Sequence, residues 1–505
     1  MGHFTIAKPT HEQLAIRDEF IHGRKPFMVV ARAGVGKTTM SFDGIEHCPE
    51  VQRGWVLYLA FNKKIEIAAK EKNGVIVVRG KDVGTPLIPR LEIKTIHSTG
   101  LRFIRTRWRD CGISFEGERA DALTASVCGA TVPEDVARLV TKLHTKAREI
   151  NPMARAIGDL TDLALQFECE PDEEHQIKGF NLDYVEARAL EAMELAAMKE
   201  PSIIDGADMI FLPIRNGWLR PTWDFALVDE TQDMTPAQLL IAKGIGKGRL
   251  GLVGDDRQAI YQFRGAGVGT MSRLQQELQA KTYPMTVTFR CGKKIVELAQ
   301  NFVPDLQAAD SNPDGEVLEG SVEQMLQMAA PGDYVLSRLN APLMPIAMSF
   351  LKAGKRAKIN GTDIGQSLVK LARKLMRRGD ESVENFITRI MLWRDNQVSR
   401  LIAAKRPQRY IDFVNDKAEM IIDLCEDMGS VSAVISRLET LFIDAGQGDT
   451  GVILCSSVHK AKGLETDRVF VLRDSLRSHT EEELNIQYVA FTRAKTTLML
   501  VSGGV

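Results

Sequence analysis

The feature that most constrains this chain is a glycine-rich segment, residues 31–38, between an apolar run at 27–30 and a helix-like stretch that starts at Met40. A strand that feeds such a turn and then a helix directs backbone N–H groups and a helix N-terminus at one point, which suits a phosphate. The segment matches the phosphate-loop pattern GxxxxGK[ST], except that Ala31 stands in place of the first glycine. It therefore predicts a nucleotide site, with a chance Gly-Lys-Thr at a helix start as the alternative.

The spacing assigns a role to several residues of this loop. Lys37 would reach the β- and γ-phosphates, and Thr38 would place its hydroxyl on Mg²⁺. Glycines let the backbone approach a phosphate because they carry no Cβ. The residues expected to contact the nucleotide here are Gly34, Val35, Gly36, Lys37, Thr38 and Thr39.

A chain of 505 residues is too long for one hydrophobic core, so we expect two or more domains. The net charge of −1 and the 44% of hydrophobic residues are typical of a globular protein and exclude no partner. Seven scattered cysteines without a CxxC pair argue against a zinc site, an iron–sulfur cluster or a disulfide framework. No apolar run reaches membrane-spanning length and the N-terminus lacks signal-peptide features, so we expect a cytoplasmic protein without a membrane partner.

Local charge is more informative than net charge. Residues 162–200 carry 11 acidic and 3 basic side chains, whereas residues 352–409 carry 15 basic and 5 acidic ones. Charge runs are most often solvated faces, but this contrast would bias a polyanion toward the second segment.

Short apolar runs that end in polar residues recur along the chain. The runs at 56–61 and 93–96 are followed by Asn62 and His97. In parallel sheets ligands bind beyond the carboxyl ends of strands, so Phe61, Asn62 and His97 would lie on the working edge. A lone histidine at such a place is more often structural than a ligand.

The strongest of these strand ends is the run 225–228 followed by Asp229 and Glu230. One carboxylate would hold the Mg²⁺ bound by Thr38, and the other would orient or deprotonate the attacking water. Two adjacent acids could merely be solvated, but a phosphate loop on the same chain makes that alternative improbable.

Two further segments allow two interpretations each. Gln13 follows the N-cap residue Thr10 at capping-box spacing, yet its amide could also bind adenine. After the run 250–254, a polar loop carries Tyr261, Phe263 and Arg264, which could pack the loop or stack on bases.

Taken in order, these motifs resemble those of the UvrD/Rep-like superfamily 1 DNA helicases. The resemblance rests on Gln13 and on residues 31–38, 60–63, 95–98, 228–233, 253–266, 289–290, 458–465 and 488–495, and it spans nearly the whole chain. It implies an α/β fold of two RecA-like lobes, each with a mainly helical insertion, with ATP between the lobes and single-stranded DNA across their top. We expect the first lobe at 1–100 and 208–285 with its insertion at 101–207, and the second lobe at 286–363 and 446–505 with a basic insertion at 364–445.

The resemblance also implies roles for single residues. Gln13 would contact adenine and Phe289 would stack on it, Gln258 would sense the γ-phosphate, and Glu465 would hold the nucleotide sugar or its own loop. Arg290 and Arg493 would act as arginine fingers. The residues expected to line the DNA path are Phe61, Asn62, His97, Tyr261, Phe263, Arg264 and His459.

We therefore predict an ATP- and Mg²⁺-dependent helicase that acts on single-stranded DNA and single-strand/duplex junctions in repair or replication, with 3′–5′ polarity implied by resemblance only. The alternative is a DNA-stimulated ATPase that strips proteins from DNA or drives a larger assembly with little unwinding of its own. A P-loop kinase or other small-molecule enzyme is a third interpretation, which leaves the two arginines and the loop aromatics unexplained.

Overall fold

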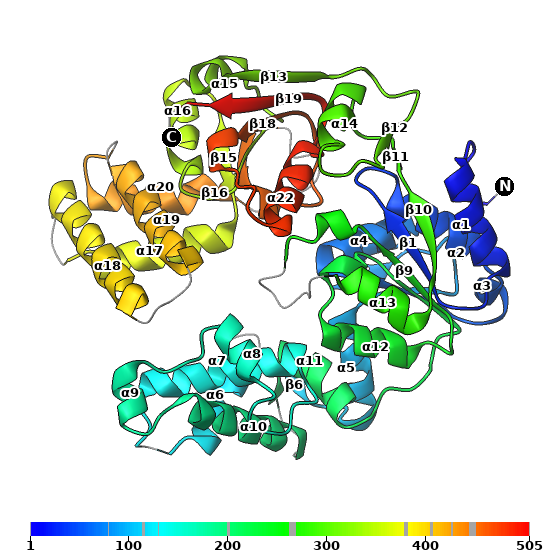
Figure 1. Cartoon of the computed structure of the whole chain (residues 1–505), viewed down its shortest axis with the longest axis horizontal. Helices are drawn as coiled ribbons and strands as arrows, with labels where there is room; N and C mark the ends of the chain where they lie inside the picture. The colour runs from blue at the N-terminus through cyan, green and yellow to red at the C-terminus, as the bar shows by residue number, and fades with distance from the viewer. Residues whose placement is uncertain are drawn as a thin grey trace. The chain divides into compact units, whose positions relative to one another are not determined.

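The computed structural model describes residues 2–78, 80–113, 117–129, 131–198, 203–261, 269–377, 382–403, 408–425, 428–443 and 451–503. The chain divides into two compact units (Figure 1). Unit 1 comprises residues 1–31 and 36–285, and unit 2 comprises residues 32–35 and 286–505. None of the helices in the described part of the chain is long and apolar enough to cross a membrane.

Unit 1 is built on a six-stranded parallel sheet in the order β10-β1-β9-β8-β2-β5. Its central strands are buried on both faces, as expected for strands covered by helices on each side. The strands are β1 (Phe27–Ala31), β2 (Val56–Ala60), β5 (Leu91–Thr95), β8 (Phe225–Val228), β9 (Leu250–Gly254) and β10 (Lys281–Met285).

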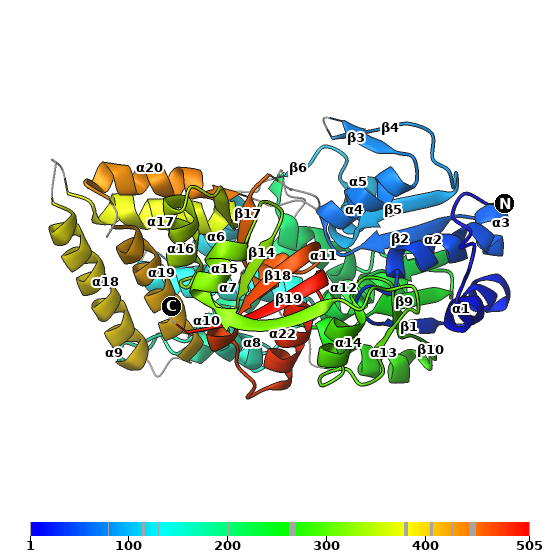
Figure 2. The ribbon, with the colours of Figure 1, turned by 90° about the horizontal axis from the view of Figure 1, so that it is seen from above.

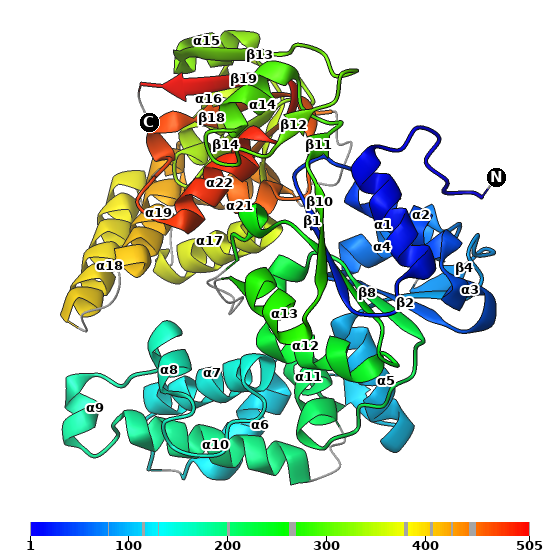
Figure 3. The same ribbon diagram turned by 45° about the vertical axis from the view of Figure 1, so that its right-hand side comes forward.

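Alternation along β2 divides its side chains between two hydrophobic layers. Leu57 and Leu59 belong to a core shared with helix α12 (Pro236–Ile245). Tyr58 points the other way, where its ring lies 5.7 Å from that of Phe42 on helix α2 (Lys37–His47). Helices α1 (His11–His22) and α2 lie to one side of β1, and α12 and α13 (Thr270–Leu278) to the other (Figure 3).

A helical insertion follows helix α5 (Ile96–Arg107). Its hydrophobic core is separate from that of the sheet and includes residues of α11 (Gly206–Arg215). Its helices gather below the sheet of unit 1 in the view of Figure 1. They are α6 (Glu118–Val127), α7 (Glu134–Ile150), α8 (Thr161–Gln166), α9 (Glu173–Ile177) and α10 (Leu182–Met198). The remaining elements of unit 1 are α3 (Pro49–Arg53), α4 (Lys63–Lys72), η1 (Thr231–Asp233), η2 (Asp256–Gln258), the hairpin β3 (Ile76–Val78) and β4 (Lys81–Val83), and the pair β6 (Gly112–Ile113) and β7 (Ile203–Ile204).

Unit 2 is built on a seven-stranded parallel sheet in the order β13-β19-β18-β14-β17-β15-β16. The strands are β13 (Glu316–Ser321), β14 (Tyr334–Ser337), β15 (Ala357–Asn360), β16 (Phe442–Ile443), β17 (Ile453–Ser457), β18 (Thr466–Leu472) and β19 (Ala494–Ser502). A separate two-stranded sheet pairs β11 (Val287–Thr288) with β12 (Gln307–Ala308).

Four helices that follow β15 form a bundle beside this sheet (Figure 2), and one hydrophobic core runs through both. These helices are α17 (Thr362–Leu375), α18 (Val383–Ala403), α19 (Gln408–Cys425) and α20 (Val431–Leu441). The positive charge of this insertion lies before residue 410, because residues 410–445 carry eight acidic and two basic side chains. The other elements of unit 2 are α14 (Lys293–Ala299), α15 (Val322–Met328), α16 (Leu343–Lys352), α21 (Val458–Ala461), η4 (Arg473–Ser475) and α22 (Glu481–Phe491).

The predicted class, α/β with two parallel sheets and helical insertions, is confirmed. Residues 286–290 form only the short strand β11, which pairs with β12 and not with the seven-stranded sheet. The neighbouring edge strand β10 contains Pro284, and a proline without an N–H is tolerated at a sheet edge.

Candidate active site

The phosphate-loop segment has the predicted geometry. Strand β1 ends at Ala31 and helix α2 begins at Lys37. Gly36, the N-cap residue of α2, has φ of +84° and ψ of 35°, a left-handed conformation that glycine adopts without steric cost. The first N–H groups of a helix have no acceptor within the helix, so the start of α2 offers donors to an anion.

Lys37 lies among carboxylates of unit 1. Its Nζ is 2.8 Å from the Glu230 Oε2. Burial acts to lower the pKa of Lys37, but Glu230, Asp229 and Asp255 together raise it above its ordinary value. The lysine is therefore a cation with 14% of its side-chain surface exposed, held in place by acidic neighbours, and its charge is available to compensate a phosphate.

Asp229 is buried at the carboxyl end of β8, beside the end of β2. Its Oδ1 accepts the Glu230 backbone N–H at 3.0 Å, and its Oδ2 accepts the Tyr58 hydroxyl. Burial and the neighbouring Glu230 raise the pKa of Asp229 to about 6. Burial and Asp229 likewise raise the pKa of Tyr58 well above its usual range.

A chain of hydrogen bonds leads from the acidic pair to the end of β9. Glu230 adopts a left-handed backbone conformation (φ +50°), which is uncommon outside glycine and concentrates at functional sites. The Gln232 Nε2 donates to the Glu230 Oε2 at 2.6 Å, and the Gln232 Oε1 accepts the Asp255 N–H at 3.0 Å. The Gln258 Nε2 in turn donates to the Asp255 Oδ2 at 2.7 Å.

Gly254 makes this chain possible. A Cβ at position 254 would lie 2.4 Å from the Gln232 Oε1 and 2.9 Å from the Met271 Sδ. The bare backbone therefore lets Gln232 reach across to the Asp255 N–H. Sequence reasoning predicted Lys37, Glu230 and Gln258 but missed Gln232 and Asp255, although both stand within the motifs that it used.

Gln13 acts as the capping residue that the sequence predicted. The Thr10 hydroxyl accepts the Gln13 N–H at 3.2 Å, and the Gln13 Oε1 accepts the Thr10 N–H at 3.0 Å. The cap uses the amide oxygen of the side chain, so the proposed contact with adenine would rely on the amide nitrogen.

Unit 2 brings two of the predicted residues, Arg290 and Glu465, together with Lys495. The Arg290 Nε is 2.6 Å from the Glu465 Oε2, and the Lys495 Nζ is 3.3 Å from the Glu465 Oε1. Burial acts to raise the pKa of Glu465, but the cations Arg290 and Lys495 hold it below its ordinary value. Glu465 therefore holds Arg290 and Lys495.

Arg493 is fully buried beside this cluster. It donates from Nε to the Val489 carbonyl at 2.9 Å and from Nη1 to the Leu464 carbonyl at 3.2 Å. Burial and the nearby Arg290 lower the pKa of Arg493 to about 10.

Phe289, by contrast, has 48% of its surface exposed. Its N–H donates at 3.0 Å to the carbonyl of Gly34, which also belongs to unit 2.

Two of the predicted DNA-contacting residues form an aromatic pair in unit 1. The rings of Phe61 and Tyr261 lie 6.3 Å apart and are tilted by only 16°. Phe61 follows β2, and Tyr261 follows η2, so this pair lies on the edge that carries the acidic site. Asn62 instead caps helix α4, because its side chain accepts the Ile65 N–H at 3.0 Å.

The other predicted DNA-contacting residues lie in several places. His97 is the second residue of α5, where burial lowers its pKa despite the opposing effect of Glu149. His459 lies on α21 in unit 2. Phe263 and Arg264 lie outside the described residues.

The residues around Asp229 fit a hard divalent cation. Thr38 and Asp229 offer hydroxyl and carboxylate oxygens, which Mg²⁺ prefers. Two adjacent carboxylates lie near the ammonium group of Lys37, and burial together with the charge of Glu230 raises the pKa of Asp229.

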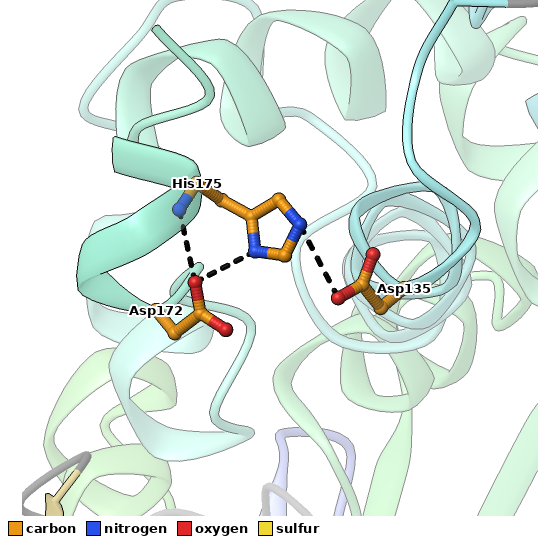
Figure 4. A group of neighbouring side chains, drawn as sticks. All are labelled: Asp135, Asp172 and His175. Atoms are coloured by element: carbon orange, nitrogen blue, oxygen red, sulfur yellow. Dashed lines mark hydrogen bonds and ion pairs between the residues drawn. The ribbon is translucent and has the colours of Figure 1, made fainter. Parts of the chain in front are cut away.

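A second group of metal-ligating side chains lies on the insertion of unit 1 (Figure 4). The His175 Nδ1 is 2.6 Å from the Asp172 Oδ1, and the Nε2 is 3.4 Å from the Asp135 Oδ2. Asp172 also caps α9 by accepting the His175 N–H at 3.0 Å, which lowers its pKa. These contacts tie α9 to α7, so we assign the group a structural role.

A parallel α/β sheet with a phosphate loop and an acidic strand end defines a P-loop nucleotide-binding protein. The profile of the UvrD/REP helicase N-terminal domain matches residues 13–279, more than half of the chain, and that of the UvrD-like helicase C-terminal domain matches residues 453–501. This chain belongs to the UvrD/REP helicase family.

Three relatives illustrate the similarity. The chain is 24% identical to F-box DNA helicase 1 of Gallus gallus, over 98% of this chain and 49% of that protein. It is 26% identical to ATP-dependent DNA helicase Rep of Escherichia coli, over 56% of this chain and 41% of that protein. The match to F-box DNA helicase protein 1 of Schizosaccharomyces pombe, also 26% identical, covers 55% of this chain and 34% of that protein. The chain thus spans about a third to a half of the length of these curated relatives.

Proposed function

We propose that this chain hydrolyses ATP to move along single-stranded DNA, with 3′–5′ polarity, and that it separates duplex at the junction ahead. Its membership of the UvrD/REP helicase family supports this assignment. The observation that carries it is the hydrogen-bond chain from Lys37 through Glu230, Gln232 and Asp255 to Gln258. This row of hydrogen bonds joins the phosphate loop to the segment that holds Tyr261.

Hydrolysis would use the groups of unit 1 in a set order. The Lys37 ammonium would turn from Glu230 to the β- and γ-phosphates, whose negative charge it neutralises. Glu230 would then accept a proton from the attacking water as a general base. Gln258 would sense whether the γ-phosphate is present. Its hydrogen bond to Asp255 would transmit this difference to Gln232, which binds the Asp255 N–H.

Thr38 and Asp229 would hold Mg²⁺, which would supply positive charge next to the transferred phosphoryl group. Arg290 and Arg493 would act on the same nucleotide as arginine fingers. Glu465 would position Arg290, because the two side chains already form a close ion pair.

The aromatic pair would serve as the stacking platform for bases. Stacking tolerates any sequence, since every base has a π-face. Phe61 and Tyr261 present nearly parallel rings, and His97 would contact the same DNA strand.

We further propose that residues 1–100 and 208–285 form the first motor lobe and residues 286–363 and 446–505 the second, with insertions at 101–207 and 364–445.

ATP turnover with single-stranded DNA, duplex DNA and RNA in parallel tests this proposal. We expect single-stranded DNA to stimulate turnover most. Lys37→Ala should abolish turnover without changing the thermal melting of the protein, because Lys37 compensates charge rather than filling the core. Lys25→Ala is the matched control, since Lys25 is exposed at the opposite end of β1.

Tailed duplexes with a 3′ or a 5′ overhang then separate the two candidate activities. Unwinding from the 3′ overhang supports the helicase. DNA-stimulated turnover without unwinding would favour a translocase that displaces proteins or drives a larger assembly. Turnover that ignores DNA, or persists at a near-normal rate in Lys37→Ala, would refute the assignment.

A further inference from the structure

Tyr58 is a polar side chain in a place that the sequence marks as core. It is the middle residue of β2, whose five residues are all buried, and none of its surface is exposed. Its neighbours Leu57 and Leu59 pack into the opposite hydrophobic layer. The tyrosine faces α2, the helix that begins at the phosphate loop, and its ring contacts Phe42.

The hydroxyl of Tyr58 contacts a group expected to hold the divalent cation, because it donates a hydrogen bond to the Asp229 Oδ2. The other carboxylate oxygen of Asp229 accepts the Glu230 N–H at 3.0 Å. Both oxygens of Asp229 are thus held by one donor each, and a carboxylate oxygen has a second lone pair to offer a metal.

Two features of the fold create this arrangement. Strand β8 pairs with β2 so that Tyr58 lies opposite Leu227, two residues before Asp229 on the same face of the sheet. Thr38 is the second residue of α2, which covers that face. A phenol at position 58 therefore reaches the carboxylate at the end of the neighbouring strand, which the shorter and apolar Leu or Val side chains common in such strands could not do.

We propose that Tyr58 is a positioning residue for the divalent cation of the nucleotide site, because its hydroxyl orients the Asp229 carboxylate. This inference rests on the proposed function. As a donor to Asp229, Tyr58 fixes the rotation of that carboxylate. Such outer partners of metal ligands typically change metal affinity 10- to 100-fold when they are removed.

Tyr58→Phe tests the inference, since it keeps the ring and removes the hydrogen bond to Asp229. The first measurement is Mn²⁺ binding to the protein–ADP complex, followed by the electron paramagnetic resonance signal of free Mn²⁺. The second is ADP binding in EDTA, followed with a fluorescent ADP analogue. We expect Mn²⁺ affinity to fall about 10-fold or more, and ADP affinity in EDTA to change less than about twofold, because the loop and Lys37 remain.

Tyr283→Phe is the matched control. Tyr283 lies on β10 of the same sheet and also donates its hydroxyl to a buried carboxylate, that of Glu19. Glu19 belongs to α1 and is not part of the proposed site, so this variant should keep the wild-type affinity for Mn²⁺.

The outcomes separate the two proposals. Wild-type Mn²⁺ affinity in Tyr58→Phe would overturn the inference and leave the proposed function standing. A fall of ADP affinity in EDTA by the same factor as Mn²⁺ affinity, or loss of the folded state, would assign Tyr58 to the core and would also overturn it. Failure of the wild-type protein to bind ADP under either condition would instead contradict the proposed function.

Discussion

The insertion of unit 1 contains a histidine whose charge state should control the stability of that region. His144 on α7 has no exposed surface, and its Nε2 is 3.1 Å from the Thr124 Oγ1. Arg148, one turn later, is also fully buried and forms ion pairs with Asp205 at 2.8 Å and with Asp208 at 2.7 Å. Burial and the Arg148 cation lower the pKa of His144 to about 3, although Asp205 and the Ala120 backbone act in the opposite direction.

The sign of the effect follows from proton linkage. An unfolded histidine titrates near pH 6.5, so between pH 6.5 and about 3 the unfolded chain binds a proton at position 144 that the folded chain does not bind. The free energy of unfolding should therefore be at its full value above pH 6.5 and fall as the pH drops through this window. At pH 5, about 1.5 units below the unfolded pKa, the loss is about 2 kcal/mol at 1.36 kcal/mol per unit.

Urea unfolding followed by tryptophan fluorescence measures this loss. Trp108 and Trp218 report on the insertion, because their rings lie 4.9 Å apart beside its core. The free energy of unfolding is compared at pH 7.5 and pH 5 for the wild-type protein and for His144→Gln, in which this proton site is absent. Other titrating groups contribute to both proteins, so their effects cancel in the difference.

We expect His144→Gln to lose about 2 kcal/mol less than the wild-type protein between the two pH values. His11→Gln, which changes an exposed histidine at the start of α1, should behave like the wild type. Equal pH dependence in His144→Gln and the wild-type protein would refute the reasoning, because it would mean that the folded chain accepts the proton at position 144 without penalty.

Two further predictions concern DNA. Phe61→Ala should weaken single-strand binding by about 1–3 kcal/mol, the value of one stacked base, in a fluorescence titration; a lowered melting temperature with unchanged binding would mark Phe61 as core. Replacing Arg373, Lys374 and Arg377 by Gln should flatten the dependence of log Kd on log salt by about 0.7–0.9 for each phosphate that is no longer bound. Arg373 already pairs with Glu439 at 2.7 Å, so Lys374 and Arg377 should account for most of the change; an unchanged slope would show that this face does not meet DNA.

Local patterns were enough to predict the strand, turn and helix of the proposed nucleotide site. A strand, a glycine-rich turn and a helix start are consecutive in the chain, so the conformations of Gly36 and Lys37 depend on neighbours within a few residues. The same holds for the capping box of Gln13 and for the acidic pair after β8. Apolar runs bounded by polar residues likewise predicted the central strands of the sheet of unit 1, because burial on both faces leaves a continuous hydrophobic signal.

The edge strands β10 and β13 escaped this reasoning. Strand β10 includes Pro284, and β13 has no fully buried residue, so neither shows a continuous apolar run. Their place in the sheets is set by pairing with β1 and β19, whose partners lie far away in the sequence. The hydrophobic pattern within one strand cannot specify such a pairing, because the pairing depends on the backbone hydrogen-bonding groups that another strand leaves exposed.

By itself, the sequence determined which residue types stand at the phosphate loop and at the strand ends, and hence the chemistry that they can perform. Tertiary structure alone decided how they are joined. Tyr58 and Asp229 are 171 residues apart, and their hydrogen bond exists because β8 lies beside β2 in the sheet. Glu465 meets Arg290 in the same way, through the folding of distant segments of unit 2. Strand order and side-chain packing bring such groups together, and no periodicity along the chain encodes them.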